Sequence, residues 1–215
     1  MALDADRQLA LSYVPAAARP AVGALWRLDV TLGAVLATGR EPMVTRIRLA
    51  WWREALEALD REPPPPEPVL QAVAAHVLPT IRGAELAAME GGWARLVGDE
   101  PLGPEALRDY AGKRGGLLFA HSARLLDGAP AVEAAGARWA LVDLARRCAD
   151  PRDSEAALAM AGSLDEPGSW PRKLRPLGML SVLARRDLVR GADAWERQGS
   201  PGRMLRMLRH RLTGG

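Results

Sequence analysis

Residues 24–60 read ALWRLDVTLGAVLATGREPMVTRIRLAWWREALEALD, and their hydrophobic spacing decides the fold. Leucines recur every three or four residues in the first half, and this spacing predicts a helix that runs to about Thr38. These leucines are Leu25, Leu28, Leu32 and Leu36. Gly39 can end this helix and Pro42 cannot continue it.

The second half of the stretch predicts another helix, from about Thr45 to Asp60. Its apolar residues are expected to form one broad face, made of Ile47, Ala50, Trp51, Leu56 and Leu59. Trp51 and its neighbour Trp52 are expected to bury a large aromatic area. A pair of helices joined by a short turn is therefore the unit on which the rest of the chain is expected to pack.

Prolines and helical spacing divide the remaining sequence into further helices. Asp4 or Asp6 can cap a first short helix that ends before Pro15, and Pro20 suits the start of the long second helix. The segment REPPPPEP predicts a stiff connector. The connector covers residues 61–68, a second loop is expected at 165–176, and a short helix is expected to begin at Asp153 or Ser154. The other predicted helices cover residues 68–78, 80–97, 104–127, 131–148, 177–198 and 201–213.

The composition favours an all-α fold in one domain over residues 1–215, because Ala, Leu and Arg are abundant and no alternating strand pattern persists. The net charge of +3 is too small to indicate binding to nucleic acid. The single Cys148 excludes an intrachain disulfide and fits a reducing compartment. The N-terminus is acidic where a signal peptide is basic, and no run of about 18 apolar residues is found. A cytoplasmic protein is expected, with a peripheral position at the membrane left open.

The segment RLAWWREALEALD (48–60), preceded by ALWRLDVTLGAVLATGRE (24–41), resembles the N-terminal part of the squalene/phytoene synthase family. In that family one helix carries Asp-x-x-x-Asp and the next carries an RLxWW-like segment. The similarity runs from about Leu9 to Leu212, with a deletion in the third quarter of the chain. It implies a single helical bundle similar to the isoprenoid-synthase fold, in a shortened form.

The resemblance implies a metal site at Asp29 that this sequence does not complete. Members of the family hold Mg²⁺ and a prenyl diphosphate between two acidic helices, and carboxylates at positions i and i+4 share one helix face. Here the position four residues after Asp29 is Gly33. Asp29 is expected either to face the old pocket or to pair with an arginine such as Arg27 or Arg53. Mg²⁺ is expected only if the protein is an active enzyme.

The second acidic motif of the family falls on GARWALVDLARRCADPRD (136–153). In this alignment Asp143 replaces an asparagine, Arg146 matches the arginine of the motif, and Arg147 replaces the metal-binding aspartate. A guanidinium cannot ligate Mg²⁺ and repels it. Both acidic motifs are thus incomplete, and no residue is assigned as catalytic or as a metal ligand.

Five residues are candidates for lining a ligand pocket: Asp29, Arg48, Trp52, Tyr110 and Arg146. Tyr110 lies in DYAGKRGGLLFAHSARLL (109–126), which is similar to the helix that lines the hydrocarbon tunnel of the family. An interior tyrosine with a bonded hydroxyl fits equally well. Arg48 beside Trp52 can hold a diphosphate, or its arginine neighbourhood can pair with glutamates on the helix surface.

The run SPGRMLRMLRHRLTGG (200–215) predicts a basic amphipathic helix. Its apolar face comprises Met204, Leu205, Leu208 and Leu212. Such a helix can lie on an anionic membrane or dock onto a partner in a membrane complex. The alternative is that the apolar face packs on the bundle and the basic face is solvated.

Two functional classes are compatible with these features. The first is a non-catalytic member of the family that binds an isoprenoid, another lipid or a protein partner in the old pocket. RLDVTLGAVLATGRE (27–41) resembles a non-catalytic branch, a mitochondrial complex I assembly factor, which implies a role in assembling a respiratory complex. The alternative is an active prenyltransferase that condenses two prenyl diphosphates head to head. The incomplete acidic motifs favour the first class.

Overall fold

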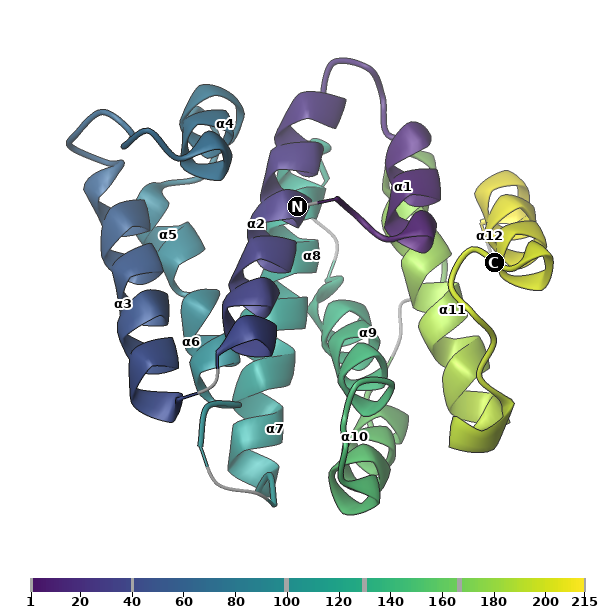
Figure 1. The fold of residues 1–215 in the computed structure, drawn as a ribbon. Coiled ribbons are helices and arrows are strands. Elements are labelled where there is room, and N and C mark those ends of the chain that lie inside the picture. The colour runs from purple at the N-terminus through teal and green to yellow at the C-terminus, as the bar shows by residue number, and fades with distance from the viewer. Residues whose placement is uncertain (1, 40, 99–100, 129–130, 166–167, 215) are drawn as a thin grey trace.

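The computed structural model describes residues 2–39, 41–98, 101–128, 131–165 and 168–214, and every regular element in these ranges is helical (Figure 1). The all-α prediction is confirmed. The first helices are α1 (Ala5–Ser12), α2 (Arg19–Thr38), α3 (Pro42–Ala58), α4 (Pro68–His76), α5 (Gly83–Ala87) and α6 (Glu90–Ala94). They are followed by α7 (Pro104–Tyr110), a π-helical segment η1 (Ala111–Gly116), α8 (Leu117–Leu125), α9 (Glu133–Ala145), α10 (Pro151–Gly162), η2 (Arg172–Leu174), α11 (Arg175–Arg190), η3 (Ala192–Ala194) and α12 (Pro201–Thr213).

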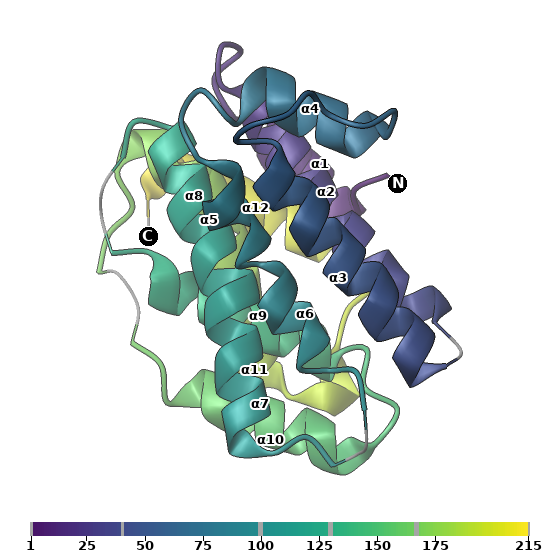
Figure 2. The same cartoon turned by 90° about the vertical axis from the view of Figure 1, so that its left-hand side faces the viewer.

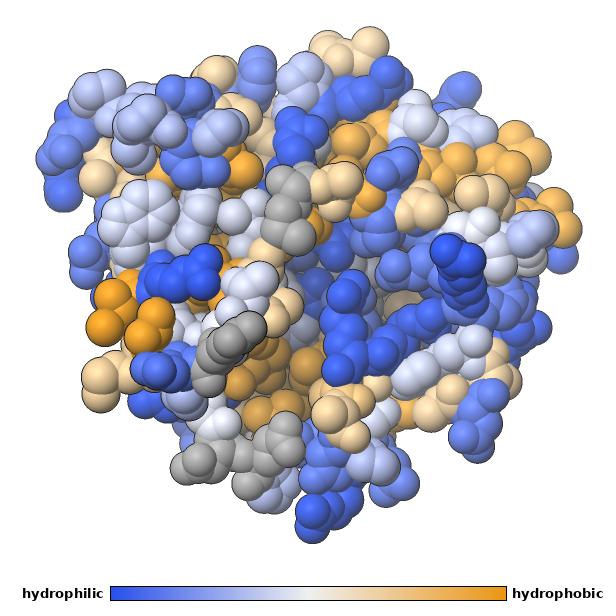
Figure 3. All heavy atoms as spheres, in the orientation of Figure 1, coloured by the Kyte–Doolittle hydropathy of each residue, from blue (hydrophilic) through white to orange (hydrophobic). Residues whose placement is uncertain are grey.

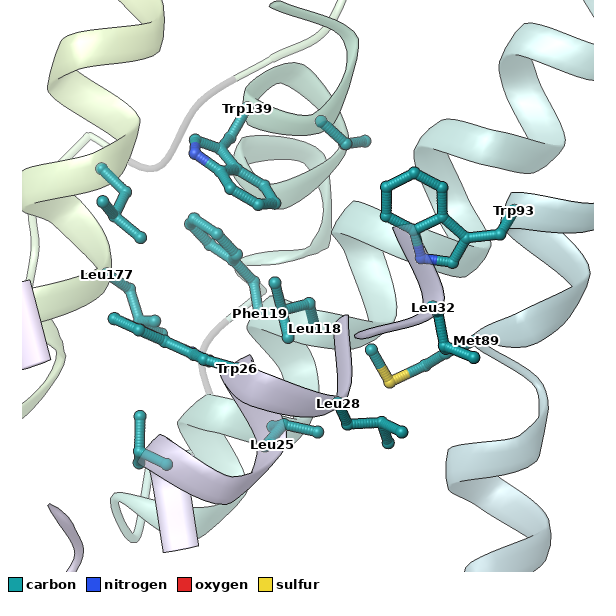
Figure 4. Packing of buried hydrophobic residues seen from close by; sticks show 14 of the residues in the cluster. Leu25, Trp26, Leu28, Leu32, Met89, Trp93, Leu118, Phe119, Trp139 and Leu177 are labelled. Atoms are coloured by element: carbon teal, nitrogen blue, oxygen red, sulfur yellow. The ribbon is translucent and has the colours of Figure 1, made fainter. Parts of the chain in front are cut away.

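Helix α2 lies at the centre of the bundle, between α3 on one side and α8 and α9 on the other (Figure 1), and α4 packs across one end of it (Figure 2). Its predicted leucine stripe is buried at Leu25, Leu28 and Leu32. Trp26 on the same helix donates from Nε1 to Ser122 Oγ of α8 at 3.0 Å, so the buried indole nitrogen is satisfied. Figure 4 shows this helix packed against aromatic residues of α8 and α9.

Helix α2 also has the length and apolar composition to cross a membrane. Core helices of soluble proteins pass the same test, and half of the apolar stretch in α2 is buried inside the bundle. Asp29 stands near its middle and is fully buried in ion pairs with other helices. The apolar character of α2 is therefore used by the protein core.

The predicted buried face of the next helix, α3, is right at Leu56, Leu59 and Trp52 and wrong at Ile47 and Trp51. Ile47 is 63 % exposed and Trp51 is 46 % exposed, together with Met43 and Val44 on the same side. The face that packs on the bundle is made of Thr45, Leu49, Trp52 and Leu56. Apolar residues occur at helical spacing on both sides of α3. Periodicity alone does not indicate which of the two sides packs against the bundle.

Several predicted helices differ from the observed ones; the helix expected to begin at Asp153 or Ser154 begins at Pro151, with Asp150 as its cap. Residues 80–97 form two short helices, α5 and α6, instead of one. Asp60 accepts hydrogen bonds from the Gly83 and Ala84 N–H groups and so fixes the start of α5. The helix predicted over 177–198 ends at Arg190, because Gly191 adopts φ 73° and stops it. In the loop predicted over 165–176, positions 166–167 lie outside the described residues, and η2 and the start of α11 occupy its end.

The segment α7–η1–α8 forms one long element, as predicted over 104–127, but its middle is π-helical. A Cβ added at Gly115 would lie 2.1 Å from the Gly136 carbonyl oxygen of α9, and the reverse approach is equally close. These glycines allow two backbones to touch. Gly115 therefore serves packing, and the π-helical turn places η1 next to α9.

Candidate functional site

Arg114 of η1 bridges carboxylates from two other helices at the centre of the molecule. Its Nε donates to Asp29 Oδ1 of α2 at 3.0 Å, and its Nη2 donates to Asp143 Oδ2 of α9 at 2.8 Å. Arg114 is 1 % exposed and Asp29 is fully buried. One guanidinium thus occupies the space between two buried carboxylates. We call Arg7, Asp29, Arg114, Asp143 and Arg147 the ionic centre.

Two further arginines close the ionic centre on either side. Arg7 of α1 donates from Nη1 to Asp29 Oδ2 at 2.8 Å. Arg147, one turn after Asp143, donates from Nε and Nη2 to Asp143 Oδ1 at 3.1 and 3.0 Å. Each of the four oxygens of the two aspartates therefore accepts at least one hydrogen bond from a guanidinium. Buried carboxylates are stable only with such partners.

Aromatic rings enclose the central guanidinium. Arg114 Cζ lies 4.3 Å from the ring centroid of Trp93 and 4.8 Å from that of Trp139. Arg114 also donates from Nη1 to the hydroxyl of Tyr110, one turn earlier in the same element. The Trp93 and Tyr110 rings meet edge to face at 5.6 Å. The faces of the rings attract the cation while they exclude water from it.

The electrostatics keep Asp143 and Arg114 charged at neutral pH. Burial by itself raises the pKa of Asp143, but the Arg114 and Arg147 guanidinium groups outweigh it and hold that pKa well below its usual range. Burial lowers the pKa of Arg114, and the nearby Asp29, Tyr110 and Asp143 more than offset this, so that it lies well above its ordinary value. Burial raises the pKa of the Tyr110 hydroxyl, which stays protonated. Asp143, Arg114 and Tyr110 are therefore not poised to exchange a proton near pH 7.

An apolar cavity of about 320 Å³ lies beside the ionic centre, between α2, α6 and α9. Figure 3 shows the molecule hollowed near the middle of this face, with apolar atoms inside the hollow. The uncharged lining comprises Val30, Gly33, Ala34, Leu36, Ala37, Trp93, Leu96, Tyr110, Leu144 and Cys148. The volume is at the lower end of the roughly 300–1,000 Å³ typical of small-molecule sites.

A polar hollow of about 460 Å³ adjoins this cavity on the other side of Asp143 and Arg147, which border both. It is also lined by Asp4, Arg146 and Arg197. The side chain of Arg147 is 57 % exposed although its guanidinium is bonded to Asp143. An apolar chamber with a cationic mouth is the result, which suits a ligand with a hydrocarbon part and an anionic end.

Gly33 lines the apolar cavity, and the absence of a side chain there leaves room for the Trp93 ring. A Cβ added there would lie 2.7 Å from the Trp93 ring, closer than real Cβ contacts. The ring that covers Arg114 thus also fills the place where a side chain at position 33 would begin. An aspartate four residues after Asp29 does not fit without moving Trp93.

The residues present do not fit the Mg²⁺ ions that the resemblance implies. Asp29 and Asp143 are bonded to guanidinium groups, and Arg147 places a cation where the resemblance implies an aspartate ligand. Within the described part of the chain, no group of three or more His, Cys, Asp or Glu side chains is arranged to hold a metal ion. A divalent cation would have to displace Arg114 and leave its charge buried without a partner.

The structure brings only some of the predicted pocket residues together. Asp29 and Tyr110 both contact Arg114 and line the apolar cavity. The predicted pairing of Asp29 with an arginine is confirmed, but its partners are Arg7 and Arg114 and not Arg27 or Arg53. These two arginines come from distant segments that pack on α2.

The other three candidates lie away from the cavity. Arg48 is exposed and donates to Thr38 Oγ1 at 3.4 Å. Trp52 is 7 % exposed in the core and does not line the cavity. Arg146 pairs with Asp187 at 3.1 Å and borders the polar hollow. Arg114 was not predicted as a site residue. The feature of the local sequence that could have indicated it is its position four residues after Tyr110, which places both on the same helix face.

Comparison with known proteins supplies one match. The sequence model of the squalene/phytoene synthase family matches residues 2–158. These residues include α1 to α9 and most of α10, and so the whole ionic centre and the apolar cavity. Searches of curated proteins and of solved structures found no match to the chain.

Proposed function

Because this chain belongs to the squalene/phytoene synthase family, we propose that it is a non-catalytic member whose old active-site chamber binds a ligand without converting it. The observation that carries the proposal is the position of Arg114 between Asp29 and Asp143. The resemblance to the family places these two residues in the two acidic motifs that hold Mg²⁺ between them in its active members. Here a fixed organic cation stands between them.

The physical reason is charge neutralisation. Ionising a prenyl diphosphate requires cations that bridge its oxygens as negative charge develops on the leaving group. Arg114 cannot serve this purpose, because its donors are committed to Asp29, Asp143 and the Tyr110 hydroxyl. Trp93 and Tyr110 also cover its face. The residues that remain accessible are apolar, with Arg147 at the edge.

The ligand class follows from the shape and lining of the chamber. Its apolar wall suits a hydrocarbon chain, and its volume of about 320 Å³ suits a single chain of isoprenoid or other lipid character. An anionic end group would reach Arg147 at the mouth and the polar hollow beyond it. A charge-assisted hydrogen bond there would fix the direction of the chain.

Turnover is tested first, with purified protein, farnesyl and geranylgeranyl diphosphates, Mg²⁺ and NADPH, and with diphosphate release as the readout. The expected result is no release above a protein-free blank, while an active synthase of the family serves as positive control. Release that requires Mg²⁺ and disappears in Asp29→Ala would overturn the proposal and make the protein a prenyltransferase with a rearranged metal site.

Binding is tested separately, by thermal shift and isothermal titration with the same diphosphates and with single-chain lipids. Ala34→Phe fills the apolar cavity and should abolish binding, whereas Ala58→Phe alters a half-buried alanine on α3 outside the cavity and should not. Arg147→Gln should weaken anionic ligands more than neutral ones of equal chain length. Equal binding by the wild type and the Ala34→Phe variant would show that the chamber is not the site.

A protein partner is the second candidate, and the outward apolar stripe of α3 is the observation that favours it. Met43, Val44 and Ile47 are exposed there beside Trp51, on the side of α3 that faces away from the bundle. The similarity to an assembly factor of respiratory complex I suggests a membrane-complex subunit as the partner. Site-specific photo-cross-linking in cells from position 47 should trap one defined subunit, and the same probe at exposed Arg61 should not. Identical patterns from both positions would contradict this role.

A further inference from the structure

Helix α12 presents its apolar stripe to solvent and buries polar residues instead. Leu205 is 70 % exposed, Leu212 is 79 % exposed and Met204 is 36 % exposed. The residues of α12 that face the bundle are Arg203, Met207 and His210. Packing of Leu205 and Leu212 on the bundle is therefore wrong. Arg203 and His210 are buried instead, while Arg209 is exposed and Arg206 half-buried on the outer side with the leucines.

Buried ion pairs fix this rotation of α12. Arg203 donates from Nε to Asp6 Oδ2 of α1 at 2.9 Å and from Nη1 to Asp187 of α11 at 2.7 Å. All three side chains are nearly inaccessible. Turning Leu205 inward would carry Arg203 outward and leave two carboxylates buried without it. The exposed leucines are thus a built feature of the fold.

The surface around the leucines is strongly basic. Residues 172–215 hold eleven of the 29 basic residues of the chain and only three of its 26 acidic ones. A hollow of about 270 Å³ between α11 and α12 is lined by Arg185, Arg186, Val189, Arg190 and Arg206, and Val189 is 83 % exposed. Among the described residues no acidic side chain forms a salt bridge with Arg206 or Arg209. In Figure 3, apolar and strongly hydrophilic atoms adjoin over the region of α12.

We infer that the α11–α12 surface, defined by Val189, Arg190, Leu205, Arg206, Arg209 and Leu212, docks on a bilayer that contains anionic phospholipids. Exposed leucine and valine side chains enter the boundary between head groups and acyl chains, and the arginines around them bind phosphate groups. Glu196 pairs with Arg186 and Arg190, but positive charge still predominates on this surface. This excess of positive charge selects the occupant, since a bilayer offers many phosphates to a rigid basic face. The inference concerns a surface that lies beyond the family match and is independent of the proposed function of the chamber.

The test measures binding of the full chain to extruded vesicles by co-sedimentation. Vesicles of 70:30 phosphatidylcholine and phosphatidylglycerol should bind the protein, and pure phosphatidylcholine vesicles should not. Leu205→Ser with Leu212→Ser should reduce binding at least tenfold, from the lost apolar burial. Ile47→Ser removes an equally exposed side chain from α3 on the far side of the bundle and should leave binding unchanged (Figure 1).

A second pair of variants tests the electrostatic part. Arg206→Gln and Arg209→Gln should each weaken binding to the anionic vesicles about fivefold, and Arg48→Gln on α3 should not. Circular dichroism of every variant should match the wild type, because the substituted side chains are exposed or half-buried. Binding that is equal on neutral and anionic vesicles, or indifferent to the leucine and arginine changes, would overturn the inference.

The competing occupant is a second copy of the chain. Sedimentation velocity should show a monomer whose mass does not change in the Leu205→Ser, Leu212→Ser variant. A dimer that dissociates in this variant would assign the surface to self-association and would also overturn the inference.

Discussion

Replacing Arg114 by methionine is expected to destabilise the protein strongly without unfolding it. The change removes the guanidinium that is bonded to Asp29, Asp143 and Tyr110 and keeps most of the side-chain volume. Loss of one partner from a buried ion pair costs about 3–5 kcal/mol. Arg7 and Arg147 still neutralise the two aspartates, so the cost should stay in this range. For a chain of this length it corresponds to a fall in Tm of about 6–20 °C.

The assay is equilibrium urea unfolding at pH 7, followed by circular dichroism at 222 nm, with Arg48→Met as the control. Arg48 is exposed, so its replacement should change the free energy of unfolding by no more than about 0.5 kcal/mol. The double variant Asp29→Leu, Arg114→Met removes both charges of one pair and should lose about 1–3 kcal/mol less than the sum of the single changes. A cost below about 1 kcal/mol for Arg114→Met, or strict additivity in the double variant, would refute the account of the ionic centre.

Two further predictions concern packing and pH. Gly115→Ala should destabilise the protein by more than about 2 kcal/mol in urea unfolding, because its Cβ would meet the Gly136 carbonyl oxygen, whereas Gly112→Ala, with open space around it, should be neutral or slightly stabilising. A harmless Gly115→Ala would show that η1 and α9 are not in backbone contact. Burial lowers the pKa of His121 below its ordinary 6.5. As the pH falls below 6.5, the unfolded chain therefore binds a proton at this histidine before the folded chain does, and the free energy of unfolding decreases. Wild-type Tm should therefore decline more than that of His121→Gln between pH 7.5 and 5.5, and parallel declines would contradict this.

Burial was predicted best from the sequence for helices with a single apolar stripe that packs against the core. Leu25, Leu28 and Leu32 of α2 are buried as expected, because that helix is surrounded on most sides, while Leu36 is half-buried at the cavity. Helix α3 carries apolar residues on two sides, and periodicity could not tell that Leu49 would be inside and Ile47 outside. In α12 the hydrophobic pattern did not predict which side faces the bundle, because Arg203 is held inward by hydrogen bonds to two buried carboxylates from α1 and α11. Ion pairs between distant helices have no local signature.

The same limit applied to the ionic centre. The departures from the acidic motifs that the resemblance implies, at Gly33 and Arg147, could be predicted from the sequence, because each lies at a fixed spacing from an aspartate. The cation that fills the gap was not visible, since Arg114 is separated by 85 residues from Asp29 and by 29 from Asp143. Pairing of this kind depends on which helices become neighbours, and only the folded chain supplies that information.

The ionic centre also constrains the mutational paths open to this chain. An aspartate introduced at position 33 meets the Trp93 ring, and Trp93 in turn covers Arg114. Removal of Arg114 alone leaves Asp29 and Asp143 facing each other with fewer partners. Each single step toward two acidic clusters thus passes through a destabilised protein, although the combined change need not be unstable. Position 33, Trp93 and Arg114 are therefore coupled, so that an acidic substitution at position 33 and a change at Arg114 should be tolerated better together than singly.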